Sequence, residues 1–193
     1  MTGRREAARR LEHLAAHDVL TGLKNRRAFD AALREHQTGR RFPDRRGAVL
    51  VVDLDGFKPI NDLHGHAAGD EALRRVAAAM VATLREDDLV GRLGGDEFGV
   101  LLGAVDSDGA VHVARTLLRA ITELDVGRPD VTLSASVGVA MLAEHDDPAL
   151  AADAAMYRVK SLGGGRVELA PAMGGVDLVA PRSSLRATIG PGG

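Results

Sequence analysis

The run of five apolar residues from Ala48 to Val52 constrains the possible folds more than any other feature of this 193-residue chain. Three of the five are valines, and a short, continuous, β-branched run predicts a strand that is buried on both faces. The run ends abruptly at Asp53, and Asp55 follows two residues later. The sequence therefore predicts a core strand with carboxylates directly after it.

Three segments have apolar residues at intervals of three and four, the spacing of one helix face. The first carries Phe29, Ala32 and Leu33, the second Leu73, Val76, Ala77, Met80 and Leu84, and the third Val111, Ala114, Leu117, Leu118, Ile121 and Leu124. Residues 131–141 instead alternate between large apolar and small or polar residues, which predicts one long strand.

The remaining elements are predicted from turn and cap residues. Gly94-Gly95-Asp96-Glu97 lies between two apolar segments, residues 89–92 and 98–102, and predicts a hairpin with carboxylates at its tip. Asp147 and Pro148 predict the cap and first turn of a last helix. That helix would end at three glycines, with Met156 and Tyr157 in the core, and a short strand over 166–169 would follow it.

This order of elements predicts an α+β fold with a ferredoxin-like antiparallel core sheet flanked by helices. We expect a short N-terminal helix or stalk over residues 1–17, a catalytic domain over 18–169 and a disordered Gly/Pro-rich tail over 170–193.

The composition excludes several classes of function. The chain has no cysteine, which excludes disulfides, thiolate zinc sites and cysteine nucleophiles. A formal net charge of −2 and 3% aromatic residues argue against nucleic-acid binding. No segment approaches the ~20 apolar residues that span a bilayer, and residues 1–16 lack the apolar run of a secretory signal. We therefore expect a cytoplasmic protein with no nucleic-acid or membrane partner.

Carboxylates of Asp53, Asp55, Asp96 and Glu97 are expected to converge, because the hairpin would pair beside the buried strand. Like charges at close range raise one another's pKa unless a cation neutralises them, which favours a hard divalent ion such as Mg2+. Mg2+ held by few carboxylates leaves room for substrate phosphates and indicates nucleotidyl transfer. The alternative is that these acids are ordinary strand-end residues beside a solvated turn.

Two other patterns give weaker signals. His64 and His66 suggest zinc, but no other pair of ligands has suitable spacing. The segment from Asp106 to Gly109 resembles a calcium loop but lacks the later glutamate, so it predicts a turn.

The run Gly94-Gly95-Asp96-Glu97-Phe98 is the signature of the GGDEF family of diguanylate cyclases. Residues 53–62 with 65–70 resemble the metal and guanine segment of that family, residues 18–27 are similar to its N-terminal motif, and residues 136–138 and 152–160 match later blocks. The resemblance covers about residues 18–169. It implies a palm-like nucleotide cyclase that condenses two GTP into cyclic di-GMP and two pyrophosphates, through attack of the 3′-hydroxyl on the α-phosphate.

The resemblance also implies roles for individual residues. Asp53, the Leu54 carbonyl, Asp96 and Glu97 would hold Mg2+, with Mn2+ as the alternative ion. The catalytic set would be Asp96, Glu97 and Lys58, with Asp96 accepting the proton of the attacking hydroxyl. The substrate-binding set would be Phe57, Asn61, His66, Asp70 and Lys160.

By the same resemblance, Asn61 and Asp70 would read the guanine edge, while Lys58 and Lys160 would neutralise the phosphates. A carboxylate accepts from both N–H groups of guanine but not from adenine, so Asp70 favours GTP over ATP and disfavours an adenylyl cyclase. The alternative for Asp70 is a helix N-cap.

Arg85 and Asp88 resemble the family's inhibitory product site, at which cyclic di-GMP would be gripped by the guanidinium and the carboxylate. Arg115 or Arg119 would complete that site. The alternative is a charged helix end that enters a turn.

One segment departs from the family pattern, since Gly163-Gly164-Gly165 replaces Gly-Arg-Asn and the arginine comes only at Arg166. Because the product is a symmetric ring made from two GTP, turnover is expected to require a homodimer. An active cyclase is the main hypothesis. The alternative is a catalytically weak or inactive GGDEF domain that serves as a receptor for GTP or cyclic di-GMP.

Overall fold

The computed structural model describes residues 15–38, 46–127 and 131–173. Its elements are β1 (Lys24–Asn25), α2 (Arg26–Gln37), β2 (Gly47–Asp55), α3 (Phe57–His64), α4 (His66–Thr83), β3 (Leu89–Gly94), β4 (Glu97–Gly103), α5 (Ser107–Thr122), β5 (Ser134–Met141), α6 (Pro148–Ser161) and β6 (Val167–Leu169). The N-terminal helix or stalk expected over residues 1–17 falls outside these ranges except for its last three residues.

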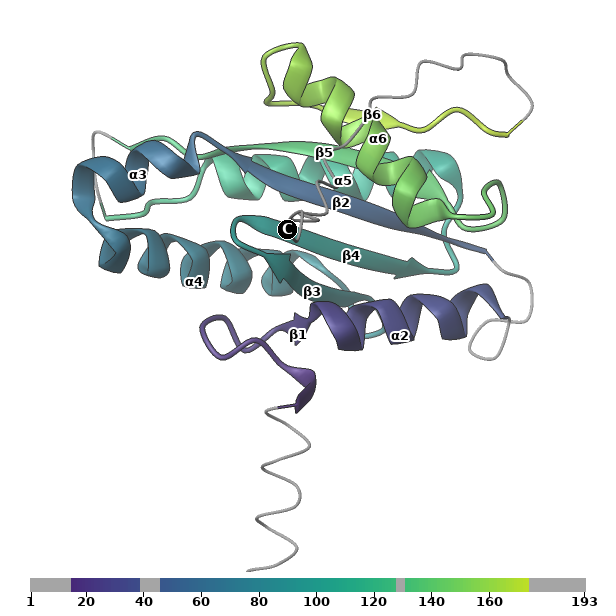
Figure 1. Cartoon of the computed structure of the whole chain (residues 1–193). Coiled ribbons are helices and arrows are strands. Elements are labelled where there is room, and N and C mark those ends of the chain that lie inside the picture. Colours follow the sequence, from purple (N-terminus) through teal and green to yellow (C-terminus); the bar gives the residue numbers. More distant parts are fainter. Residues whose placement is uncertain (1–14, 39–45, 128–130, 174–193) are drawn as a thin grey trace, which may run out of the picture.

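The strands form one six-stranded sheet in the order β1-β3-β4-β2-β5-β6 (Figure 1). The four central strands, β3, β4, β2 and β5, are antiparallel to one another, and their order is that of a ferredoxin-like core. At the two edges of the sheet, the short strand β1 pairs in parallel with β3, and the short strand β6 pairs in parallel with β5. The predicted α+β fold with helices on a ferredoxin-like sheet is confirmed.

Strand β2 lies in the centre of the sheet, and its first eight residues are buried. Leu50, Val52 and Leu54 face the cluster that contains α4 and α5, whereas Val49 and Val51 face the cluster that contains α2 and α6. Because strand side chains alternate between faces, Asp53 shares the face of Val51. The last part of β2 thus presents its acids on the α6 side.

Several predicted boundaries are wrong by a few residues. Strand β2 continues through Asp53 to Asp55, so both acids belong to the strand. Strand β5 begins only at Ser134, because β2 ends at the residue that pairs with it and Val131 has no strand opposite. Leu84 and Leu124 were predicted to be helical, but α4 ends at Thr83 and α5 at Thr122, although both leucines still pack on the core.

Helix α3 and strand β1 were not predicted, because eight and two residues are too few to show a period. Asp70 is the fifth residue of α4, whose N-cap is Gly65, so the N-cap interpretation of Asp70 is wrong. Met156 is buried as expected, but the side chain of Tyr157 points outward and is 54% exposed.

The last helix and the hairpin were predicted correctly. The Asp147 side chain caps α6 by accepting a hydrogen bond from the Leu150 amide at 3.0 Å, and Pro148 lies in the first turn. Asp106 caps α5 in the same way, so the turn predicted over residues 106–109 is wrong and this segment is the start of a helix.

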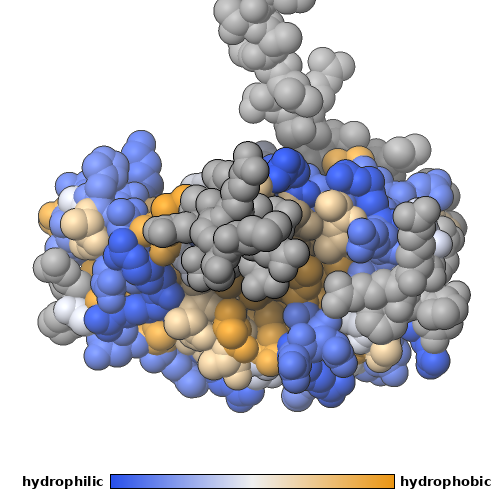
Figure 2. Space-filling model, turned by 90° about the horizontal axis from the view of Figure 1, so that it is seen from below, coloured by the Kyte–Doolittle hydropathy of each residue, from blue (hydrophilic) through white to orange (hydrophobic). Residues whose placement is uncertain are grey.

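The expected tail begins inside the fold, since Ala170 is buried and donates its amide to the Val139 carbonyl at 2.7 Å. The rest of that tail, from residue 174, lies outside the described residues. Figure 2 shows the underside of the molecule, where apolar side chains gather in the middle of the face and hydrophilic ones at both ends. No helix in the described ranges is both long enough and apolar enough to cross a membrane.

Candidate active site

The end of β2 and the turn between β3 and β4 lie side by side. Asp53 is directly opposite Glu97 in the β2–β4 register, and the Leu54 amide donates a hydrogen bond to the Asp96 carbonyl at 3.2 Å. Gly95 in the turn has a φ of 48°, a conformation that favours glycine. The fold therefore brings together the two acidic segments that the sequence separates by about forty residues.

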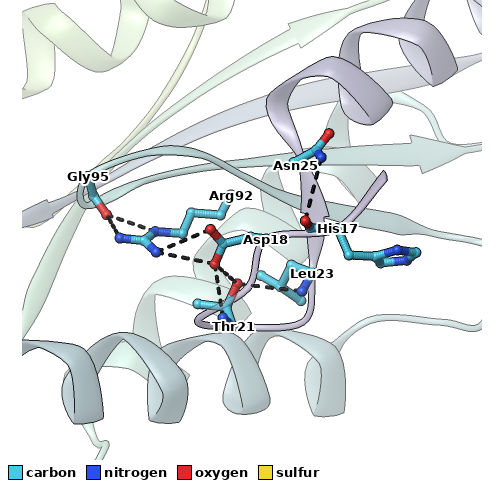
Figure 3. A network of polar contacts seen from close by, with 7 residues as sticks. All are labelled: His17, Asp18, Thr21, Leu23, Asn25, Arg92 and Gly95. Atoms are coloured by element: carbon cyan, nitrogen blue, oxygen red, sulfur yellow. Dashed lines mark hydrogen bonds and ion pairs between the residues drawn. The ribbon is translucent and has the colours of Figure 1, made fainter. Parts of the chain in front are cut away.

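A guanidinium from β3 fixes the tip of this turn (Figure 3). Arg92 donates two hydrogen bonds to the Gly95 carbonyl, at 2.9 and 2.7 Å, and forms an ion pair with Asp18 at 3.2 Å. Asp18 in turn accepts from the Thr21 hydroxyl at 2.7 Å and from its amide at 2.9 Å. The loop before β1 is thereby linked to the residue that precedes Asp96.

The carboxylate of Asp53 is almost fully buried and faces Lys160 of α6. Asp53 Oδ1 lies 2.5 Å from Lys160 Nζ, and the two side chains are 8% and 38% exposed. Burial raises the pKa of Asp53 to about 6; the Lys160 ammonium opposes this shift, while Asp96 and Glu97 add to it. Partial burial works to lower the pKa of Lys160, but the bond to Asp53 and the surrounding carboxylates raise it.

Glu97 also has a cationic partner. Arg26, the first residue of α2, forms a 3.2 Å ion pair with Glu97 Oε2 and donates to the Leu93 carbonyl at 2.6 Å. Both side chains of the pair are substantially exposed, so the ion pair itself contributes little stability. The turn is therefore held from two sides, by Arg92 within the hairpin and by Arg26 from α2.

The predicted guanine-binding residues lie where α3 meets α4. A Cβ on Gly69 would lie 2.0 Å from Asn61 Oδ1 and 3.1 Å from the Phe57 ring, so a glycine is needed for α3 to approach α4 this closely. Asp70 follows Gly69 directly and is half-buried. The structure thus brings Asn61, Phe57 and the backbone next to Asp70 into one neighbourhood.

The other predicted site residues lie nearer the surface. Lys58 in α3 and His66 at the start of α4 are exposed. Arg85 and Asp88 form a tight turn after α4, in which the Arg85 amide donates to Asp88 Oδ2 and the Asp88 amide to the Arg85 carbonyl, both at 3.1 Å. These two residues thus lie beyond the end of the helix.

The oxygen ligands at the end of β2 fit a hard divalent cation. Asp53 carries a carboxylate whose ionisation is opposed by burial and by two neighbouring acids, and a divalent ion would relieve both effects. Within the described residues, no group of three or more His, Cys, Asp or Glu side chains could hold a metal by itself. This is compatible with Mg2+, which commonly uses one or two carboxylates and completes its shell with phosphates and water.

A cavity of about 370 Å3 lies away from these acids. Its lining includes Leu142, whose amide donates to the Gly47 carbonyl at the opposite end of β2. We place the candidate site at the β2 end rather than there, because the acidic side chains and the Lys160 ammonium lie together at that end.

Sequence reasoning missed the residues that support the acids. It gave no role to Arg92 or Arg26, and it quoted Asp18 and Ser136 only as parts of motifs. Arg92 lies 74 positions from Asp18, and no local pattern reports such a contact. Asp55, expected beside Asp53 in the acidic group, is engaged by Ser136 and by the backbone after α6.

Known proteins with similar sequences include several diguanylate cyclases. The chain is 36% identical over 170 residues to the probable diguanylate cyclase DgcC of Escherichia coli K12, covering 86% of this chain and 46% of that protein. It is 41% identical over 168 residues to diguanylate cyclase TpbB of Pseudomonas aeruginosa, covering 83% and 38%. The chain thus spans less than half the length of these curated relatives.

Similar solved structures also include diguanylate cyclases. The coiled coil and GGDEF domain of DgcB from Caulobacter crescentus, in complex with c-di-GMP, superposes with a TM-score of 0.79 at 26% identity, covering 86% of this chain and 91% of that chain. Diguanylate cyclase SiaD of Pseudomonas aeruginosa, in complex with its activator SiaC, gives a TM-score of 0.74 at 34% identity, covering 86% and 66%. The family model described as "Diguanylate cyclase, GGDEF domain" matches residues 15–166. Since that match covers most of the sequence, the chain belongs to the GGDEF domain family of diguanylate cyclases.

Proposed function

We propose that this domain is an active diguanylate cyclase that condenses two GTP into cyclic di-GMP and two pyrophosphates. The observation that carries the proposal is the pairing of Asp53 with Glu97 and of the Leu54 amide with the Asp96 carbonyl. This pairing puts a buried carboxylate, two turn carboxylates and the Lys160 ammonium at one end of the sheet.

GGDEF diguanylate cyclases generally need a divalent metal, and we propose Mg2+, with Mn2+ as the alternative ion. Asp53, the Leu54 carbonyl, Asp96 and Glu97 would hold it. When bound, such an ion stabilises negative charge on the phosphate oxygens and lowers the pKa of an attacking hydroxyl.

The side chains of the chain itself would supply the remaining chemistry. Lys160 and Lys58 would neutralise phosphate charge, and Asn61, Asp70 and Phe57 would bind the guanine where α3 meets α4, with His66 at the rim. Asp96 would take up the proton of the 3′-hydroxyl at its carboxylate. Arg92 would keep that carboxylate in place by gripping the preceding carbonyl.

Two domains would have to face each other, because each has one set of these residues and the product contains two guanosine units. Turnover is therefore expected to rise more steeply than linearly with protein concentration. Cyclic di-GMP would act as product and, through Arg85 and Asp88, as inhibitor.

The test is incubation of the purified chain with GTP and Mg2+ or Mn2+ over a range of protein concentrations, with the product identified by mass spectrometry. We expect cyclic di-GMP and pyrophosphate with GTP, and no cyclic product with ATP. Absence of cyclic di-GMP at high protein concentration with either ion would refute the proposal.

The glycine segment after α6 favours one alternative, a weak or inactive domain that binds GTP or cyclic di-GMP as a receptor. The Arg166 guanidinium donates to the Leu162 carbonyl at 3.4 Å, next to the end of α6. Calorimetry that detects GTP or cyclic di-GMP binding without turnover would favour the receptor.

A further inference from the structure

The carboxylate of Asp55 connects strand β5 with the glycine segment that follows α6. Asp55 is the last residue of β2, two positions after Asp53. Its Oδ1 accepts a hydrogen bond from the Ser136 hydroxyl of β5 at 2.7 Å, and its Oδ2 accepts one from the Gly165 amide at 2.8 Å. Each carboxylate oxygen of Asp55 therefore already has a protein donor.

The glycine segment is shaped to meet this carboxylate. A Cβ on Gly164 would lie 2.6 Å from Asp55 Oδ2 and 2.7 Å from its Cγ, whereas a Cβ on Gly163 would meet nothing within 4 Å. The backbone at Gly164 has a φ of 75°, which favours glycine. Close approach of the chain to Asp55, rather than flexibility alone, thus explains the glycine at position 164.

The same segment ends helix α6. The Gly164 amide donates to the Val159 carbonyl at 3.0 Å, and the Gly163 amide donates to the Lys160 carbonyl at 3.1 Å. These bonds satisfy carbonyl groups of the last helical turn, the turn that carries Lys160. Consecutive residues therefore connect the C-terminal end of α6, through Gly165, to the carboxylate of Asp55.

We propose that Asp55 is a positioning residue that fixes the end of α6 and so holds the Lys160 ammonium at the phosphate-binding side of the site. This inference rests on the proposed cyclase function for its kinetic part only. Asp53 contacts Lys160 directly, but a divalent ion at Asp53 would compete for that carboxylate. The Asp55–Gly165 bond keeps the helix end in place independently of Asp53.

The main test is the Asp55→Asn variant. An asparagine can still accept from Ser136 through its carbonyl, but its amide group cannot accept from the Gly165 amide. We expect hydrogen exchange at the Gly165 amide of the metal-free protein to become about tenfold faster. We also expect KM for GTP to rise about tenfold with kcat changed less than about twofold, because phosphate charge is present in both substrate and transition state.

A double-mutant cycle shows whether Asp55 acts through Lys160. In a Lys160→Gln background, Asp55→Asn should change KM by less than about twofold, because the group that it positions is gone. Full additivity of the two changes, or unchanged exchange at Gly165, would overturn the proposal. A loss of Mn2+ affinity in the nucleotide-free Asp55→Asn protein, with GTP affinity kept, would identify a metal ligand instead and also overturn it.

A second pair of variants keeps the test valid if Asp55→Asn fails to fold. Gly164→Ala and Gly163→Ala both place a side chain at positive φ, but only the first brings a methyl group against Asp55. We expect the KM increase with Gly164→Ala alone; equal effects of both would overturn the proposal. Asp153→Asn, a change of the same charge on the exposed side of α6, serves as control. If the wild type lacks turnover, the exchange measurement still decides the role of Asp55, and only the proposed function fails.

Discussion

Replacing Asp53 by asparagine should stabilise the metal-free protein while removing its activity. The pKa of Asp53 is raised from 3.8 to about 6, first by burial and further by Asp96 and Glu97. When folding raises the pKa of a carboxyl group, ionisation of that group costs more free energy in the folded state than in the unfolded state and so destabilises the folded protein. The two pKa values differ by about two units, which corresponds to about 3 kcal/mol of lost stability at neutral pH.

The sign of the pH dependence follows from the same shift. Below about pH 4 the carboxyl is protonated in both states, and Asp53→Asn should change stability little. The advantage of the variant should grow between about pH 4 and pH 6 and stay constant above that range. Lys160, whose side chain is 38% exposed, can keep its hydration when its partner becomes neutral.

Thermal unfolding followed by circular dichroism, with a chelator present, measures this effect. For a domain of this size about 3 kcal/mol corresponds to a rise in Tm of about 6–12 °C at pH 7.5. The exposed Asp153→Asn variant should shift Tm by less than about 2 °C. Adding Mg2+ and a non-hydrolysable GTP analogue should stabilise the wild type and not Asp53→Asn. A variant that is less stable than the wild type at pH 7.5, or equally affected at pH 4 and pH 7.5, would refute the reasoning.

Three further variants test other contacts. Arg92→Lys keeps the charge but loses the two hydrogen bonds to the Gly95 carbonyl. We expect the free energy of unfolding in urea to fall by about 1 kcal/mol and kcat/KM to fall about tenfold. Wild-type activity of this variant would argue against a positioning role for Arg92. Gly69→Ala places a Cβ 2.0 Å from Asn61 Oδ1, so calorimetry should show GTP affinity reduced more than about tenfold in a folded protein, and unchanged affinity would place the guanine elsewhere. Gly138→Ala places a Cβ 1.9 Å from the Ala152 carbonyl, so α6 must move off β5; we expect Tm to fall by about 9 °C or more, and a change below about 2 °C would show that the helix yields easily.

The sequence predicts the elements that have a clear local signal. These signals are the valine-rich run of β2, the hairpin glycines and the Asp147–Pro148 start of α6, and all three elements were predicted correctly. Helix α3 lacks such a pattern because its eight residues combine site residues with only two buried ones, Phe57 and Ile60. The start of β5 at Ser134 depends on where its partner strand β2 stops, which only the sheet register reveals.

The candidate site was predictable in part. The acids of β2 and of the turn could be assigned to one site, because a hairpin that follows a strand–helix unit pairs beside that strand in this topology. The supporting contacts could not be predicted, since Arg92 with Asp18 and Asp55 with Gly165 join residues 74 and 110 positions apart. Asp70 shows the opposite problem: its sequence context suggests a cap, and only the helix start at His66 removes that interpretation.

The most direct test of the site is where a paramagnetic ion binds. We expect substoichiometric Mn2+, added to 15N-labelled protein with a non-hydrolysable GTP analogue, to broaden the amide resonances of Leu54 and Asp96 before all others, and this broadening to disappear in Asp53→Asn. Broadening centred on Glu144 and Asp146, at the cavity beside the opposite end of β2, would contradict the placement of the active site.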